Sequence, residues 1–305
     1  MKTNPGIYHQ AVLLHESIEQ LNIQPGGVYL DATYGGGGHS RLILERLGPQ
    51  GRLIAFDQDA DAKANVVDDS RLHFIPENFR YASRFLRLYG YTRLDGVLAD
   101  LGVSSWQFDT ADRGFSTRYE AELDMRMDRR MNKTAATVLN TYNEKQLQQV
   151  FELFGEVTNA RWLAKQIVHQ RKVHAFHTLN EFKQCIASGI YGNPNKYLAQ
   201  VFQALRIEVN EELEVLKEFL QTITPVISPR GRLCVITFHS LEDRLVKQWM
   251  RAEEFEEASA WLLMPKQPSL RVMSKKPLVA SEEETKKNPR ARSAKLRVAE
   301  KRLGN

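Results

Sequence analysis

The segment from Val28 to Ser40, VYLDATYGGGGHS, joins a short apolar strand to four consecutive glycines and then to the start of a helix. Val28 to Leu30 are apolar and compatible with a strand, and Asp31 closes it. Gly35 to Gly38 carry no Cβ, so their backbone can adopt positive φ and approach a ligand closely. We expect Ser40 to cap the helix that follows. This order of strand, glycine turn and helix predicts an α/β fold with a nucleotide-like ligand at the turn.

The glycine turn alone does not specify the ligand. Gly35, Gly37 and Ser40 do not complete the dinucleotide-binding fingerprint, which has glycine or alanine in the third place, and the lysine of a P-loop is missing. Four glycines could also form a plain flexible connection. The choice of ligand therefore depends on the residues of the next strand.

Asp57 follows the apolar strand Arg52 to Phe56. A carboxylate at the carboxyl end of the second strand can accept hydrogen bonds from both ribose hydroxyls of an adenosine. We interpret Asp59, two residues on, as a cap for a helix from Ala60 to Val67. Asp57 therefore favours an adenosine-containing ligand.

The composition is that of a globular protein. A length of 305 residues suggests about two domains, and 42% hydrophobic residues are enough to build cores. No apolar run approaches the ~20 residues that cross a bilayer, and the first residues lack the apolar core of a signal peptide. We expect a soluble, cytoplasmic protein without a membrane partner. Cys185 and Cys234 lack metal-ligand spacing, so we expect neither a disulfide nor a metal site.

The positive charge of the chain lies at its C-terminal end. Residues 266–305 contain 12 Lys or Arg and 4 Asp or Glu, whereas the whole chain has a net charge of +5. Such an end suits a polyanion such as RNA, although solvated basic tails are also common. Arg290 and Arg292 are the candidate phosphate contacts. Nothing in the sequence indicates an oligomeric state.

Four further segments have strand patterns: Leu72 to Ile75, Leu94 to Asp100, Arg232 to His239, and a weaker one from Ala294 to Ala299. Helical patterns lie between the first pairs of strands. Alternating strands and helices predict a doubly wound, mostly parallel sheet that binds ligands at the carboxyl ends of its strands.

Between the fourth and fifth strands the chain has a helical character. Helical spacing covers Ala135 to Leu153, Ala160 to His169 and Leu179 to Ile190, and a longer pattern runs from Asn195 to Thr222. We predict a first sheet segment over 1–109, an inserted helical domain over 110–200 and a second sheet segment over 201–305. Residues 274–293 are predicted to be a mobile loop.

Two cofactor classes fit the glycine turn and Asp57: nicotinamide or flavin dinucleotides, and S-adenosyl-L-methionine. The fourth strand ends in LDGVLADLGVSS, which places Asp100 and the turn from Leu101 to Ser105 beside the glycines. A methyltransferase holds the reacting end of its cofactor there. The tyrosine and lysine pair or histidine base of a hydride-transfer enzyme does not stand out.

Eight segments resemble, in order, motifs of the bacterial RsmH (MraW) small-subunit ribosomal RNA methyltransferases. They are DATYGGGGHSRLIL, LIAFDQD, DGVLADLGVSSWQFD, RGFS, LDMRMD, FQALRIEVNEEL, ITFHSLEDRLVK and NPRARSAKLRVAE. The resemblance extends over nearly all the chain and implies a Rossmann-like class I methyltransferase fold. It also implies the reaction, in which S-adenosylmethionine methylates the exocyclic N4 amine of a cytidine in the decoding region of 16S ribosomal RNA.

The resemblance also implies which residues contact the cofactor. They are Gly37, Gly38, His39, Asp57, Phe79, Asp100 and Gln107. The amides of the glycine turn would face the methionine portion, and Phe79 would lie against adenine. Without the family, Phe79 would be interpreted as a core residue and Gln107 as a loop residue.

Asp100 is the candidate catalytic residue. A cytidine amine is a poor nucleophile because its lone pair is delocalised into the ring, so alignment with the methyl group and a nearby proton acceptor both help. We expect Asp100 to be that acceptor or to position the amine. A role limited to hydrogen bonds with the cofactor or its own loop stays open.

Several neighbours have two interpretations. Trp106 could stack on a flipped cytidine, but packing is favoured. His239 could touch the acceptor base, whereas HSLEDR is typical of a capping box in which Ser240 opens a helix. LDMRMD, at 123–128, is expected to fix the junction between domains, or its methionines contact the cofactor. Two other functions remain: a non-catalytic RNA-binding assembly factor, and a methyltransferase for protein or a small molecule.

Overall fold

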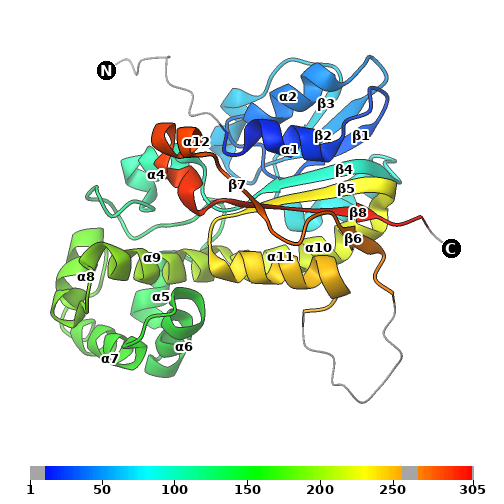
Figure 1. Ribbon diagram of the computed structural model, residues 1–305. Coiled ribbons are helices and arrows are strands. Elements are labelled where there is room, and N and C mark those ends of the chain that lie inside the picture. Colours follow the sequence, from blue (N-terminus) through cyan, green and yellow to red (C-terminus); the bar gives the residue numbers. More distant parts are fainter. Residues whose placement is uncertain (1–10, 256–266, 304–305) are drawn as a thin grey trace. The chain divides into compact units, whose positions relative to one another are not determined.

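The computed structural model describes residues 11–255 and 267–303, and the chain forms two compact units (Figure 1). The first comprises Met1–Gly102 with Glu214–Asn305, and the second Val103–Leu213. The second unit extends beyond the predicted range of 110–200 because α9 (Pro194–Asn210) packs with the other helices of that unit, against α5 and α6.

The first unit is built on one eight-stranded sheet in the order β3-β2-β1-β4-β5-β8-β6, with β7 paired to β8. The strands are β1 Val28–Asp31, β2 Arg52–Phe56, β3 Leu72–Ile75, β4 Leu94–Asp100, β5 Ile227–Thr237, β6 Leu270–Val272, β7 Leu278–Val279 and β8 Lys295–Lys301. Strands β1 to β5 run parallel to one another, and β8 pairs antiparallel with β5, β6 and β7. The predicted mostly parallel sheet is therefore confirmed.

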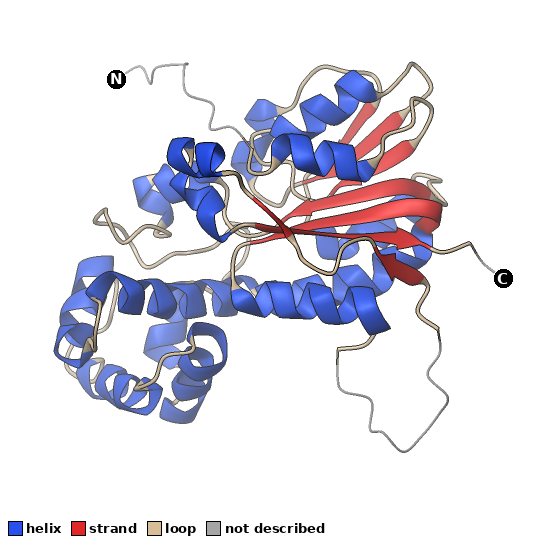
Figure 2. Cartoon of the chain, viewed as in Figure 1, coloured by secondary structure: helices blue, strands red, loops and turns tan. Residues whose placement is uncertain are grey.

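Residues alternate between the two faces of the sheet, as the pleat of a strand requires. The strand residues on the same face as Val97 pack with α3 (Ala82–Leu88), α10 (Glu212–Ile223) and α11 (Ser240–Ala252). Those on the opposite face, with Leu98, pack with α1 (Leu14–Leu21) and α2 (Gly38–Arg46). Helices on both faces make the fold doubly wound (Figure 2). The carboxyl ends of β1, β2, β4 and β5 share one edge, where Asp100 of β4 lies opposite Ile236 of β5.

The C-terminal part is more regular than predicted. The expected mobile loop over 274–293 is wrong, because the segment contains β7, α12 (Glu282–Lys287) and the 3-10 helix η6 (Pro289–Ser293). The Glu284 carboxylate accepts a hydrogen bond from the backbone N–H of Leu13 at 2.8 Å, and Ala291 is fully buried. These contacts fix a polar segment that composition alone presents as mobile.

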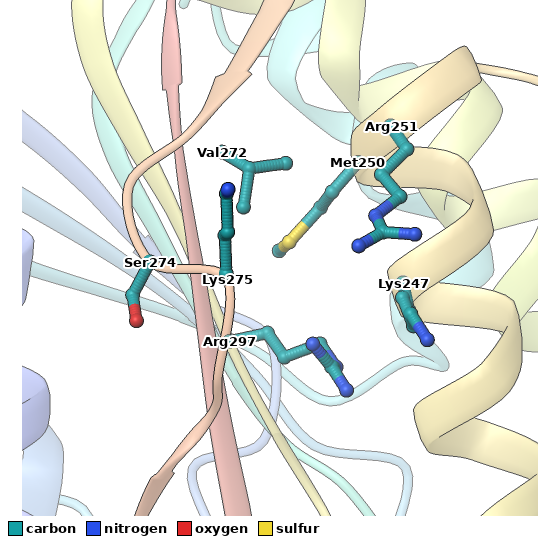
Figure 3. Close-up of a pocket in the computed structure, with 7 residues that line it drawn as sticks. All are labelled: Lys247, Met250, Arg251, Val272, Ser274, Lys275 and Arg297. Carbon is teal, nitrogen blue, oxygen red and sulfur yellow. The ribbon is translucent and has the colours of Figure 1, made fainter.

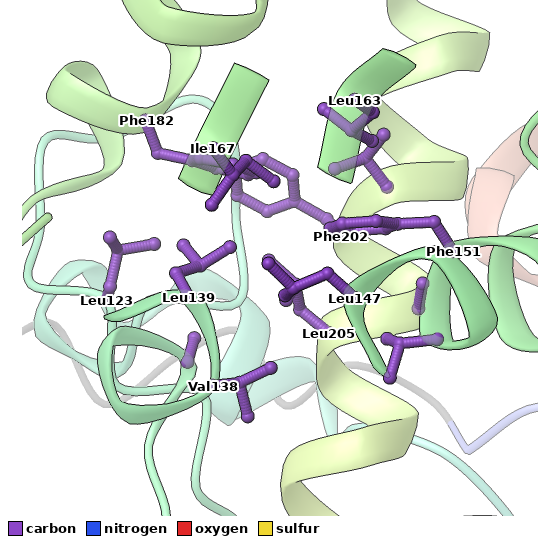
Figure 4. Close-up of a cluster of buried hydrophobic side chains, with 14 of the residues drawn as sticks. Leu123, Val138, Leu139, Leu147, Phe151, Leu163, Ile167, Phe182, Phe202 and Leu205 are labelled. Atoms are coloured by element: carbon purple, nitrogen blue, oxygen red, sulfur yellow. The ribbon is translucent and has the colours of Figure 1, made fainter. Parts of the chain in front are cut away.

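The second unit is helical, with α4 (Ser105–Asp109), α5 (Ala135–Thr141), α6 (Glu144–Gly155), α7 (Ala160–Gln170), α8 (Leu179–Ile186) and α9. Its core brings together side chains from five of these helices, including Leu139, Leu147, Phe151, Phe182 and Phe202 (Figure 4). None of the described helices of either unit is long and apolar enough to cross a membrane.

Two predicted long helices are each two helices. The pattern from Ala135 to Leu153 is interrupted at Tyr142, which has extended backbone, and Asn143 then starts α6 with a capping box to Gln146. The pattern from Asn195 to Thr222 is interrupted at Glu211, whose φ is 52°. In both cases the apolar periodicity continues across a change of direction, so spacing alone does not reveal the break.

Candidate functional site

The glycine turn lies at the carboxyl edge of the sheet, between β1 and α2. Gly35 and Gly37 have positive φ, 51° and 75°, and a Cβ on Gly37 would come within 2.8 Å of the Tyr34 hydroxyl. A Cβ on Gly36 would meet open space. The turn is therefore packed against Tyr34 and leaves backbone accessible at Gly36.

The prediction that Ser40 caps α2 is wrong. The helix begins at Gly38, its N-cap residue Gly37 makes no side-chain hydrogen bond, and Ser40 lies inside the first turn. The Ser40 hydroxyl instead donates to Asp31 Oδ2 at 2.6 Å. Open amides at the start of this helix suit an anionic or polar ligand group.

Asp57 follows β2 and holds the glycine turn. One carboxylate oxygen accepts the N–H of Gly35 at 2.7 Å, and the other accepts the N–H of Asp59 at 2.8 Å. Burial raises the pKa of Asp57 to about 7, against the effect of these two hydrogen bonds, and the charges of Asp59 and Asp31 add to the rise. Asp59 caps a 3-10 helix, η1 (Ala60–Asn65), which is shorter than the predicted helix.

Asp31 ends β1 and is buried. Burial raises its pKa to about 6, although the Ser40 hydroxyl and the N–H of Thr33 donate hydrogen bonds to the carboxylate. Sequence reasoning took Asp31 only as the end of a strand. Its partner Ser40 is nine positions away, and only the fold brings the two together.

Asp100 ends β4, and its side chain is 24% exposed. Its backbone N–H donates to the Thr33 hydroxyl at 2.7 Å. Oδ1 is buried and has no hydrogen-bond partner among the described residues. Burial raises the pKa of Asp100 well above its usual range, and the negative charges of Asp31 and Glu242 raise it further. Such an oxygen calls for a donor that the described chain does not supply.

His39 lies beside Asp100 and is buried. Its Nε2 is 3.2 Å from the Val12 carbonyl, which can only accept, so Nε2 carries the hydrogen. Burial lowers the pKa of His39 to about 4, so the ring is neutral and Nδ1 has a free lone pair, 3.9 Å from Asp100 Oδ2. His39 therefore adds no positive charge to the carboxylates at this edge.

Phe79 follows β3 and opens a 3-10 helix, η2 (Phe79–Tyr81), that Asn78 caps. Its ring is half-buried and packs edge-on against Phe219, with centroids 5.0 Å apart. The side chain of Asn78 donates to that of Gln58 at 2.7 Å and so links the segments that follow β3 and β2. The sequence offered no signal for this pair.

Gln107 and Trp106 belong to the second unit. Gln107 is buried and completes a capping box with Ser104 at the start of α4. Trp106 is 59% exposed, so the favoured packing role is wrong. The methionines of LDMRMD, Met125 and Met127, are buried in this unit's own core. The junction role of the motif and the alternative of a cofactor contact stay predictions.

His239 caps α11. Its Nδ1 accepts the N–H of Glu242 at 3.4 Å, and Glu242 Oε2 accepts the N–H of Phe238 at 2.9 Å. The prediction that Ser240 is the cap is therefore wrong by one residue, because a histidine nitrogen takes the role of the serine hydroxyl. Arg290 and Arg292 lie on η6, where Arg292 is exposed and Arg290 half-buried.

The three carboxylates of Asp31, Asp57 and Asp100, called here the acidic edge, form the centre of the site. The charge of Asp31 raises the pKa of both other groups, so the three share one electrostatic environment. None of them has an ion pair with a Lys or Arg within the described ranges. A positively charged ligand would relieve the repulsion.

The family model and the most similar curated proteins point to the same family. The model of the MraW methylase family matches residues 6–302. The chain is 52% identical to the ribosomal RNA small subunit methyltransferase H of Phocaeicola vulgatus over 299 residues, which cover 97% of this chain and 98% of that one. Its identity to the protein of the same name from Christiangramia forsetii is 49% over 298 residues, or 96% and 98% of the two chains.

Solved structures are less similar. A putative rRNA methylase from Clostridium thermocellum has 11% sequence identity and a TM-score of 0.46, over 97% of this chain and 100% of that one. The assignment to the Rossmann-like class I methyltransferase fold therefore stands on the strand order and the family match.

Proposed function

Because the chain belongs to the MraW methylase family, we propose that it transfers a methyl group from S-adenosylmethionine to the N4 amine of a cytidine in the decoding region of 16S ribosomal RNA. Its partner is then the RNA of the small ribosomal subunit, and its place of action the cytoplasm. The structural observation that carries the proposal is the acidic edge beside an open glycine turn.

The residues of this edge fit S-adenosylmethionine. The cofactor carries a positively charged sulfonium, and the acidic edge holds negative charge that no cationic side chain of the described residues balances. Asp57 has one lone pair left on each oxygen after its two backbone hydrogen bonds, enough to accept from the two ribose hydroxyls. When bound, the cofactor supplies an activated methyl group.

Each other binding residue has a proposed task. The backbone from Gly36 to Gly38 would contact the methionine portion of the cofactor. Because the His39 ring is neutral, it forms no ion pair with the Asp100 carboxylate, which stays available to the ligand. Phe79 offers a ring that packing on Phe219 already orients, for contact with adenine. The role of Gln107 rests on the family resemblance alone.

Asp100 is proposed to handle the amine proton. The methylated amine must lose one N–H proton as the new N–C bond forms, and Oδ1 is a buried acceptor without a partner among the described residues. The raised pKa makes the Asp100 carboxylate a stronger base than an ordinary aspartate. The same oxygen would align the amine before transfer.

Methyl transfer to the natural substrate tests the proposal. The full chain is incubated with methyl-labelled S-adenosylmethionine and small ribosomal subunits that lack the modification, and the RNA is digested to nucleosides. Label in N4-methylcytidine is expected. Cofactor and RNA binding without label would indicate a non-catalytic assembly factor, and label only on protein or a small molecule would indicate another acceptor.

A further inference from the structure

A hollow on the first unit gathers four cationic side chains from α11, β8 and the loop after β6 (Figure 3). Lys247 and Arg251 stand one turn apart on α11, Lys275 follows β6, and Arg297 lies on β8. We call these four residues the basic hollow. Because they come from positions far apart in the sequence, the fold itself assembles this concentration of positive charge.

Most of this charge is not balanced. Arg297 makes two hydrogen bonds to the carboxylate of Asp243, at 2.6 and 3.1 Å. Lys247, Arg251 and Lys275 have no ion pair with any residue that the structure describes, and all three are exposed. Like charges around one hollow repel each other, and an anion placed among them would remove that cost.

Two apolar side chains also line the hollow. Met250 points between the cations, and Val272 lines the opposite side (Figure 3). A phosphodiester backbone needs exposed cations, which Lys247, Arg251 and Lys275 supply. An anionic lipid surface fits less well, since membrane-binding patches project apolar side chains, whereas Met250 is only 1% exposed.

The position along α11 connects the hollow to the proposed reaction. This helix starts directly after β5, at the edge of the sheet that carries Asp100. A helix rises about 1.5 Å per residue, so Lys247 lies roughly 10 Å along α11 from Ser240. A strand of RNA at the acidic edge is therefore within a few nucleotides of the basic hollow.

We propose that the basic hollow binds the phosphodiester backbone of the RNA substrate, outside the nucleotide that is methylated. The proposal rests on the function proposed above and adds a binding surface distinct from the cofactor residues. Contacts of this kind position the substrate without reading its sequence.

The test compares two double variants of the full chain. Lys247→Ala with Arg251→Ala removes two charges from the basic hollow, and Arg84→Ala with Arg87→Ala removes two exposed charges from α3, which follows the strand at the far end of the sheet order. The probes are unmethylated small-subunit ribosomal RNA, a single-stranded oligoribonucleotide, and vesicles of anionic phospholipid. Binding is measured across a salt series, together with cofactor binding and the kcat and KM for RNA.

The hollow variant is expected to bind both RNAs roughly threefold to tenfold more weakly and to lower the salt slope by about 1.5 to 2, while the α3 variant stays near wild type. KM should rise with kcat and cofactor affinity unchanged. Equal effects in both double variants, or an unchanged salt slope in the hollow variant, would overturn the proposal. Loss of vesicle binding with RNA binding intact would assign the hollow to a membrane.

These readouts separate the two proposals. If the wild-type chain binds RNA but transfers no methyl group, the proposed function fails, while the binding comparison still decides whether the hollow holds phosphate. If methyl transfer is normal and the hollow variant behaves like wild type, only the inference about the hollow fails.

Discussion

The acidic edge and the basic hollow belong to the same unit but hold opposite charge in opposite surroundings. The carboxylates of the edge are buried enough that the pKa of Asp57 rises to about 7, whereas the cations of the hollow are exposed except for Arg297, which Asp243 neutralises. The edge is therefore suited to one small cation held tightly. The hollow is suited to a long anion held loosely.

Mutations at the acidic edge and at the basic hollow should differ in the size of their effect and in its dependence on salt. A charge in a buried site interacts strongly and is screened little by salt, whereas exposed charges interact weakly and are screened within about 10 Å at 0.1 M salt. Changes at the acidic edge should thus cost orders of magnitude in catalysis or cofactor binding. Changes at the basic hollow should cost severalfold in RNA binding and depend on salt.

The largest effect is expected from Asp100→Asn. Loss of the proton acceptor should lower kcat by about 10² to 10⁴-fold, on the scale of general acid–base catalysis, and loss of one charge of the acidic edge should also weaken cofactor binding, by a smaller factor. Single-turnover methyl transfer measures this, with Asp61→Asn, an exposed carboxyl of η1, as the matched control. A kcat within a few-fold of wild type would leave Asp100 without a role in proton transfer.

Asp57→Ala should weaken S-adenosylmethionine binding by about 1.5 to 3 kcal/mol, because hydrogen bonds from ribose to a charged acceptor are lost. Calorimetric titration gives this value directly. Asp59→Ala is the matched control, since it removes the cap of η1 two residues away and should cost about 0.5 to 2 kcal/mol of stability with little loss of affinity. Equal affinities in wild type and Asp57→Ala would remove the ribose assignment.

Cofactor affinity should rise with pH. Asp57 has a pKa of about 7 in the free protein, so much of it is protonated at pH 6. A sulfonium favours the carboxylate, so binding should strengthen about tenfold between pH 6 and pH 8, with proton release. Equilibrium dialysis across this range measures the trend. Asp57→Asn should reduce this pH dependence, with Asp31 and Asp100 still titrating, and a flat profile in the wild type would speak against coupling of charge and binding.

The smallest effect is expected from Asp243→Asn, which leaves Arg297 without its carboxylate and adds one positive charge to the basic hollow. RNA affinity at low salt should increase by about twofold to fivefold, the range of one weak ion pair with phosphate, and the gain should vanish at high salt. Filter binding at two salt concentrations detects it. Weaker RNA binding in this variant would argue that phosphate does not enter the hollow.

Much of the sheet was predictable because its strands are short apolar runs bounded by polar residues. The bounds of β2, β3 and β4 agree with the sequence pattern residue for residue, and β5 begins earlier, at Ile227. The short edge strands β6 and β7 were not predicted, since two or three residues carry no periodicity. They form by pairing with β8.

The site was predictable where one segment contains the whole feature. The glycine turn and the cap at Asp59 are local, and both are present. The bond from Ser40 to Asp31, the neutral His39 beside Asp100, and the basic hollow depend on residues that only the fold brings together. The sequence located the basic charge in the C-terminal segment but not the contribution of α11.

Calorimetric titration of the full chain with S-adenosylmethionine at pH 8 tests the central claim most directly. The acidic edge and glycine turn predict saturable binding of one cofactor per chain. Absence of binding heat, both for the isolated chain and with unmethylated small subunits present, would contradict the account.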